Sequence, residues 1–134
     1  MQLMILLTAD YANIDRPSEK LNVLGAFKYI FADRFPHRHN RMAVVVKLRP
    51  DFGDHSDDRE LSIVLSDADG IELVRFAIPF SFPLGEGGHR PEFQGVIELN
   101  NLEFPRPGIY EFTVMVDDQV LGSTPVELRA PIAR

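Results

Sequence analysis

The 134-residue chain contains no cysteine and no tryptophan. The absence of cysteine excludes disulfide bonds and thiolate metal sites. Long apolar runs are also missing. Residues 3–7 form a run of only five apolar residues before Thr8, which is too short to span a membrane, and no basic segment precedes it as in a signal peptide. We therefore expect a cytoplasmic protein that does not associate with membranes.

Basic residues are outnumbered by acidic ones, and the formal net charge is −6. Nucleic acids and anionic membranes attract basic patches, so we expect neither as a partner. The single basic cluster consists of Arg34, His37, Arg38, His39 and Arg41. Charge runs are usually solvated, so a solvated loop is the favoured interpretation of this cluster and an anion site is the alternative.

Helical periodicity is absent, because no stretch holds a 3.6-residue apolar repeat for three turns. Apolar and polar residues instead alternate with a period of two, most clearly over residues 110–116 and 120–128. Asp117-Asp118 lies between these two segments and predicts a two-residue hairpin turn, since Asp tolerates positive φ. Pro125 cannot donate a ladder hydrogen bond and therefore predicts a sheet edge.

About eight strands can be placed, and turn signals separate them. A change of phase in the fifth strand predicts a bulge near Leu73–Val74, and the sixth strand is expected to end at Asn100-Asn101. The pattern predicts one all-β domain over residues 1–134, an antiparallel β-sandwich of Greek-key or jelly-roll type. The expected strands are residues 2–11, 22–31, 41–49, 61–65, 71–80, 93–99, 110–116 and 120–128.

The first expected strand, residues 2–11, is apolar on both faces. Such a strand is either central in its sheet or covered by another chain. A symmetric homodimer through residues 2–11 would provide that cover.

Tyr110 follows a Pro107-Gly108 turn. In Greek-key sandwiches, a Tyr at this place often returns its hydroxyl to the preceding connection, an arrangement called the tyrosine corner. A plain core Tyr is the alternative. Both interpretations are structural.

Two histidines, His37 and His39, share one face if they lie on a strand. A zinc site needs further ligands at matched distances, and nothing in the sequence brings His55 or His89 to them. Solvated loop histidines are the favoured interpretation, and we assign no metal ligands.

Acidic residues gather in two loops, residues 51–58 and 67–70. If both loops lie at one end of the sandwich, their oxygen ligands could hold Ca²⁺, although the regular EF-hand spacing is absent. An ordinary hairpin turn also explains the second loop. The acidic residues concerned are Asp51, Asp54, Asp57, Asp58, Asp67 and Asp69.

Catalytic motifs are not found. The glycines Gly85, Gly87 and Gly88 lack the Lys-Ser/Thr of a phosphate loop. Nucleophilic catalysis needs a hydroxyl beside a base with a third orienting group, and no motif places such a base beside a serine of this chain. We therefore expect no enzyme activity, no cofactor and no catalytic residues. The serines considered are Ser62, Ser66, Ser81 and Ser123.

The order of motifs resembles a family of small, uncharacterised bacterial all-β proteins, known only as a domain of unknown function. That family usually has Asp-Gly at the late turn, where this chain has Asp117-Asp118, and this puts only the turn geometry in question. The resemblance implies a β-sandwich and provides no catalytic residues to carry over. It rests on Asp10-Tyr11-Ala12, residues 20–27, Phe35-Pro36, residues 107–110, residues 116–118 and residues 121–126.

A polar group beside Gly25, formed by Tyr11, Lys20 and Asn22, is a candidate groove. Periodicity and turn chemistry already explain all three as strand-end, solvated and turn residues, and this is the favoured interpretation.

Three functions remain open at this point. The favoured one is a non-enzymatic binding or assembly module, either a homodimer or a module with another protein partner. The alternatives are a divalent-cation site in the acidic loops and, least favoured, a small hydrolase with scattered loop residues.

Overall fold

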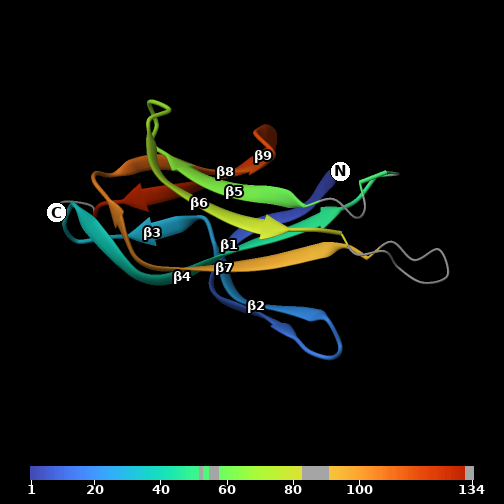
Figure 1. The fold of residues 1–134 in the computed structure, drawn as a ribbon. Helices are drawn as coiled ribbons and strands as arrows, with labels where there is room; N and C mark the ends of the chain where they lie inside the picture. Colours follow the sequence, from blue (N-terminus) through green and yellow to red (C-terminus); the bar gives the residue numbers. More distant parts are fainter. Residues whose placement is uncertain (52, 55–57, 83–90, 132–134) are drawn as a thin grey trace.

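The computed structural model describes residues 1–51, 53–54, 58–82 and 91–131, and no helix occurs among them. Nine strands form the fold (Figure 1). They are β1 (Gln2–Asp15), β2 (Lys20–Phe27), β3 (Tyr29–Phe31), β4 (His37–Arg49), β5 (Arg59–Ser66), β6 (Glu72–Phe80), β7 (Phe93–Phe104), β8 (Gly108–Val116) and β9 (Gln119–Arg129).

Two sheets face each other. One has the strand order β2-β1-β4-β7 and the other has the order β3-β9-β8-β5-β6. All pairs are antiparallel except β3 and β9, which run parallel. The connections β4–β5, β6–β7 and β7–β8 cross from one sheet to the other, as in Greek-key sandwiches. The predicted all-β sandwich is confirmed.

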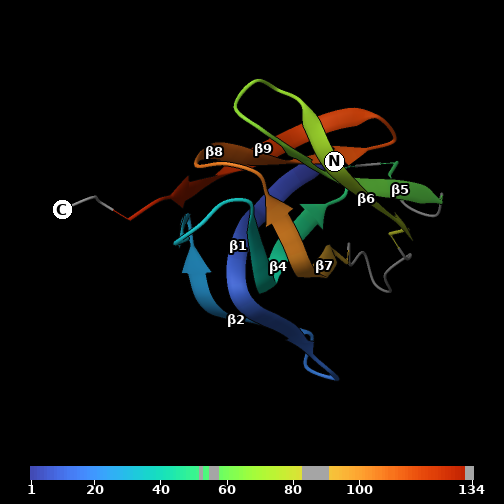
Figure 2. The same cartoon turned by 90° about the vertical axis from the view of Figure 1, so that its left-hand side faces the viewer.

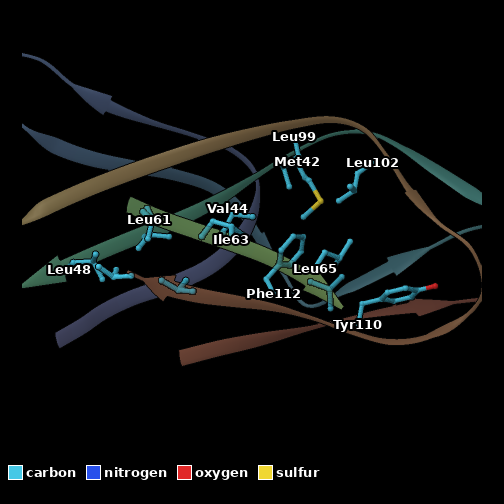
Figure 3. Packing of buried hydrophobic residues seen from close by; sticks show 14 of the residues in the cluster. Met42, Val44, Leu48, Leu61, Ile63, Leu65, Leu99, Leu102, Tyr110 and Phe112 are labelled. Atoms are coloured by element: carbon cyan, nitrogen blue, oxygen red, sulfur yellow. The ribbon is translucent and has the colours of Figure 1, made fainter. Parts of the chain in front are cut away.

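The main core lies between the sheets, where alternate residues of β4, β5 and β8 point toward one another (Figure 3). These side chains are fully buried or nearly so, and they follow the period of two seen in the sequence. They include Met42, Val44, Leu48, Leu61, Ile63, Leu65 and Phe112.

A second, smaller apolar cluster covers the outer face of the four-stranded sheet. The outer part of the β1–β2 hairpin, with β2, extends below β4 and β7 in both views (Figures 1 and 2). Its tip returns to β7, where Gln94 Nε2 donates to the carbonyl of Glu19 at 2.9 Å. The cluster joins Ala12, Leu21 and Val23 of the hairpin to Ile5, Leu7, Ala43, Val45 and Val96.

The first strand therefore has apolar cover on both faces, and its own chain supplies that cover. Leu3 and Leu6 pack against the main core, while Ile5 and Leu7 belong to the outer cluster. β1 continues to Asp15, beyond the expected end at residue 11, because β2 pairs with it up to Asp15. Cover of these faces by a second chain is not required, and a homodimer through residues 2–11 stays a prediction.

The expected second strand is divided in two, which raises the strand number from eight to nine. β2 pairs with β1 up to Phe27, whereas β3 pairs with β9 from Tyr29 onward. The chain changes sheets at Lys28, whose carbonyl accepts a hydrogen bond from Glu127 N at 2.8 Å.

The start of β4 and the end of β7 were also predicted wrongly. β4 begins at His37 rather than at residue 41, and β7 continues to Phe104 instead of ending at Asn100-Asn101. These extra residues pair with one another, His37 opposite Phe104. Asn101 has a φ of 56°, a left-handed conformation that Asn tolerates within a strand.

The turn chemistry was predicted correctly. Asp117 and Asp118 have φ values of 49° and 67°, the double positive φ of a two-residue hairpin turn. In β6, Leu65 pairs with Val74 but Ser66 pairs with Glu72, which places the predicted bulge at Leu73.

The tyrosine corner is present. The Tyr110 hydroxyl donates to the carbonyl of Arg106 at 2.6 Å and accepts from Arg106 N at 3.1 Å. The Tyr110 ring packs edge-on against Phe104, with ring centroids 5.0 Å apart. The plain core Tyr is thus excluded in favour of the corner.

Candidate functional site

One long side of the sandwich is left incompletely paired. β2 pairs with β1 only from Thr8 onward, so within the described chain residues 2–7 have β4 as their only ladder partner. β3 joins β9 only at Glu127, so residues 119–126 pair with β8 alone. Two open strand edges therefore lie on the same side, and Pro125 lies on one of them, as predicted from the sequence.

These two edges approach each other at one point and then diverge. Leu3 of β1 occupies the space beside Gly122 of β9, since a Cβ added to Gly122 would lie 2.5 Å from Leu3 Cδ2. Farther along, Leu6 of β1 and Thr124 of β9 both line a groove of about 590 Å³. We call it the aromatic groove, and its lining is Leu6, Leu7, Thr8, Ala26, Phe27, Lys28, Tyr29, Phe31 and Thr124.

The change of sheet at Lys28 forms the end of this groove. Thr8 Oγ1 donates to the carbonyl of Phe27 at 2.7 Å and fixes the last residue of β2. After Lys28, Ile30 points into the core while the flanking aromatics Tyr29 and Phe31 point outward. The alternation along β3 therefore places both aromatic rings at the groove.

These aromatic side chains are unusually exposed for their size. Phe31 is 72% exposed and Tyr29 is 49% exposed. The Arg129 guanidinium lies 3.8 Å from the centroid of the Tyr29 ring and pairs with Glu127 at 3.2 Å. Tyr29 is therefore held in place by a cation–π contact, whereas Phe31 presents an open apolar surface.

His37 and His39 lie beside the groove, behind Phe27. The favoured interpretation of them as solvated loop residues was wrong, because both lie on β4, are partly buried and share one face, with His37 Nε2 3.3 Å from His39 Nδ1. The Phe27 and His39 ring centroids are 6.2 Å apart. Burial lowers the pKa of His39, repulsion from His37 lowers it further, and Asp10 opposes the shift.

A metal centre at these histidines would need a third ligand. Among the residues that the structure describes, no group of three or more His, Asp and Glu side chains is placed to hold a metal ion. His55 and His89 lie outside the described residues.

The basic cluster of the sequence does not act as one patch. Arg41 pairs with Glu98 and lies 5.3 Å from the centroid of the Tyr11 ring, on the β1–β2 side. Arg34 and Arg38 instead border a second hollow of about 370 Å³, which shares Phe31 with the groove. The cluster is therefore divided, and Arg34, His37 and Arg38 line the hollow that adjoins the groove at Phe31.

The acidic loops lie at opposite ends of β5, so the idea of one shared calcium site is wrong. Asp51 and Asp54 precede β5, and both pair with the Met1 amino group. Hydrogen bonds from that amino group and from Asp51 N lower the pKa of Asp54. Asp58 also precedes β5, and Asp57 lies outside the described residues.

The second acidic loop follows β5 and has structural roles. Asp67 Oδ1 accepts hydrogen bonds from the backbone N–H groups of Asp69 and Ile71, both at 2.9 Å. Arg106 pairs with Asp67 at 3.1 Å and with Asp69 at 3.4 Å. These contacts agree with the hairpin-turn interpretation.

The candidate groove beside Gly25 is instead the exposed face of the hairpin. Tyr11 lies opposite Leu24, and Lys20 lies opposite Asp15 at the hairpin tip, four residues farther along β1. That separation is about 13 Å at the rise of a strand. Asn22 lies between them, opposite Asn13.

A further hollow of about 540 Å³ lies between the hairpin tip and the start of β7. Its charged groups are engaged with one another, since Arg16 pairs with Glu19 at 2.9 Å and Lys47 lies 3.9 Å from Glu92. This self-pairing makes it a weaker candidate for a ligand site than the aromatic groove.

Sequence reasoning missed the aromatic groove, although one signal for it was present. Phe27 and Ile30 both pack against the core, and they are three residues apart. Core residues on one regular strand are separated by an even number of positions, so an odd spacing signals a bulge, as between Leu3 and Leu6 of β1, or a change of sheet. The odd spacing marked the change of sheet at Lys28 that forms the groove.

No helix among the described residues is long and apolar enough to cross a membrane. None of the curated proteins matches this chain.

Among solved structures, this chain is similar to the alkylpurine DNA glycosylase AlkC of Pseudomonas fluorescens, bound to DNA containing an abasic site analog. The TM-score is 0.55 at 16% identity, and the match covers 96% of this chain but only 30% of that chain. This chain thus spans less than a third of the length of the enzyme, and the likeness shows the fold alone.

Residues 4–129 match a family described as a family of unknown function, DUF6941. The match covers all nine strands almost completely. The resemblance noted in the sequence is therefore confirmed, and this chain belongs to the DUF6941 family.

Proposed function

We propose that this chain is a non-enzymatic binding module that takes up an extended polypeptide segment as an additional strand in the groove beside β1. The observation that carries the proposal is the open edge of β1 over residues 2–7, next to an apolar groove. An open edge offers backbone donors and acceptors in a row, and a partner strand satisfies them.

The edge of β1 is a better acceptor for such a strand than the edge of β9. β2 ends at Phe27, opposite Thr8. An added strand could therefore pair with residues 2–7 of β1, at the position in the sheet that β2 would occupy if it were longer. Three consecutive residues of β1 line the groove, whereas Thr124 is the only β9 residue in the lining. Pro125 removes one donor from the β9 edge.

The groove wall supports side-chain recognition as well as backbone pairing. Strand-addition sites gain affinity from main-chain hydrogen bonds and specificity from pockets that receive alternate side chains. Leu6, Phe27 and Phe31 offer apolar surface for alternate side chains of an incoming strand. Exposed apolar surface next to polar residues is typical of interaction sites.

A DNA-binding role has less support. The similar solved structure is of a DNA glycosylase bound to DNA, but that likeness extends to the fold alone. This chain carries a net charge of −6, which disfavours non-specific contact with nucleic acid backbones.

The test is a selection from a random 12-residue peptide library displayed on phage, with binding then measured by isothermal titration calorimetry. We expect enriched peptides with apolar residues at alternate positions. The substitution Ala26→Arg places a bulky side chain at an exposed position of the groove lining and should abolish binding. Its matched control is Ser123→Arg, an exposed β9 position outside the lining, which should leave binding intact.

Equal enrichment on the wild-type chain and on Ala26→Arg would overturn the proposal. Sedimentation velocity of the wild-type chain tests the competing occupant, a second copy of the chain. A stable dimer that Ala26→Arg dissociates would replace the peptide ligand with the homodimer predicted from the sequence.

A further inference from the structure

Basic residues border the aromatic groove, and their charge bears on which polypeptide the groove can bind. Phe31 lines both the groove and the adjoining hollow, which Arg34 and Arg38 also border. Lys28 lines the groove itself. We call Lys28, Arg34 and Arg38, together with Phe31, which lines both hollows, the basic strip.

The charge of this region is opposite to that of the whole chain. Residues 28–41 contain four Lys and Arg residues and a single acidic one, Asp33, while the chain as a whole carries −6 with histidine counted as neutral. Arg41 pairs with Glu98 and so contributes little. Lys28, Arg34 and Arg38 form no ion pair with any residue that the structure describes.

The other charged neighbours cancel the charge of the strip only in part, and Asp33 is the acidic residue that lines the same hollow as Arg34 and Arg38. Arg129 lies over Tyr29 and is paired with Glu127, so these two charges compensate each other. Glu103 lies opposite Arg38 in the β4–β7 ladder. Lys28 and Arg34, both exposed, are therefore the cations most available to a ligand.

We infer that the groove selects an acidic extended polypeptide, with apolar side chains against Phe27 and Phe31 and carboxylates toward Lys28 and Arg34. This inference rests on the proposed strand-binding function. In an extended segment, side chains alternate between two faces, so a segment of alternating apolar and acidic residues can meet both requirements. Opposite charge across an interface favours the right partner and speeds its association.

The experiment uses blocked decapeptides in which valine alternates with glutamate, glutamine or lysine. We expect the glutamate peptide to bind about tenfold more tightly than the glutamine peptide, and the lysine peptide to bind most weakly. The double substitution Lys28→Glu/Arg34→Glu should weaken the glutamate peptide at least about tenfold and leave the glutamine peptide unchanged. Higher ionic strength should reduce the preference.

The control is Arg16→Glu/Lys20→Glu, which makes the same charge change at exposed positions on the hairpin tip. It should change the affinity for the glutamate peptide less than about twofold, because exposed charges beyond a Debye length are largely screened. If both double variants weaken binding of the glutamate peptide equally, the net charge of the chain explains the preference, and the inference is overturned.

Failure of the inference and failure of the proposed function give different results. Equal binding of all three peptides, lost in Ala26→Arg, overturns the acidic preference and keeps the strand-binding function. Absence of binding by all three peptides and by the library overturns both. A third outcome is that no peptide binds, but a 15-nucleotide oligothymidine binds to the wild-type chain and not to Lys28→Glu/Arg34→Glu. That result would assign the strip to single-stranded nucleic acid instead.

Discussion

Removal of one hydroxyl group, in the substitution Tyr110→Phe, tests whether the connection before β8 depends on the tyrosine corner. The ring is 2% exposed and stays packed against Phe104, so the change leaves the apolar contacts in place. Two hydrogen bonds to Arg106, at 2.6 and 3.1 Å, are lost. At about 1 kcal/mol for each hydrogen bond, the free energy of unfolding should fall by about 2 kcal/mol.

The assay is urea unfolding followed by circular dichroism, together with thermal unfolding. For a chain of this length, a loss of that size lowers Tm by about 6–10 °C. The matched control is Tyr11→Phe, which removes a hydroxyl from a ring that is 40% exposed and should change the stability by less than about 0.5 kcal/mol. Equal effects of the two substitutions would refute the structural role of the corner.

Three further predictions concern the strands that border the groove. Gly25 has a φ of 68°, and an added Cβ would lie 2.5 Å from Asp10 Oδ2, so Gly25→Ala should cost about 1–2 kcal/mol in urea unfolding, and Asp10→Ala in the same chain should recover part of the loss. Thr8→Val removes the hydrogen bond to Phe27 and should cost about 1 kcal/mol; no loss would show that this bond does not fix the end of β2. Burial lowers the pKa of His39, so the folded state binds fewer protons than the unfolded state, and stability should fall as the pH drops through the unfolded pKa near 6.5. Urea unfolding of His39→Asn between pH 7 and 5 should show a flatter profile, and an unchanged slope would contradict the assignment to His39.

The period of two and the turn residues allowed most of the sandwich to be predicted from the sequence. The alternation in β4 and β8, the Asp117-Asp118 turn and the bulge at Leu73 depend on local side-chain chemistry, and all were found as expected. Strand ends were harder, because β4 and β7 extend each other by pairing His37 with Phe104, a contact between distant segments.

The candidate site could not be predicted in the same way. The groove results from the change of sheet at Lys28 and from the unequal lengths of β1 and β2, which local patterns do not reveal. The acidic loops illustrate the opposite error. Their carboxylates indicated a shared cation site, but β5 separates Asp54 from Asp67, and each is already bonded to groups of its own end of the fold.

Hydrogen exchange of the β1 amides, measured with and without a selected peptide, tests the account most directly. Strand addition predicts at least about tenfold slower exchange at open-edge amides within residues 2–7 of the wild-type chain, and no change in Ala26→Arg. Binding that leaves the exchange of residues 2–7 unchanged, or that protects the hairpin tip at residues 15–20 instead, would contradict it.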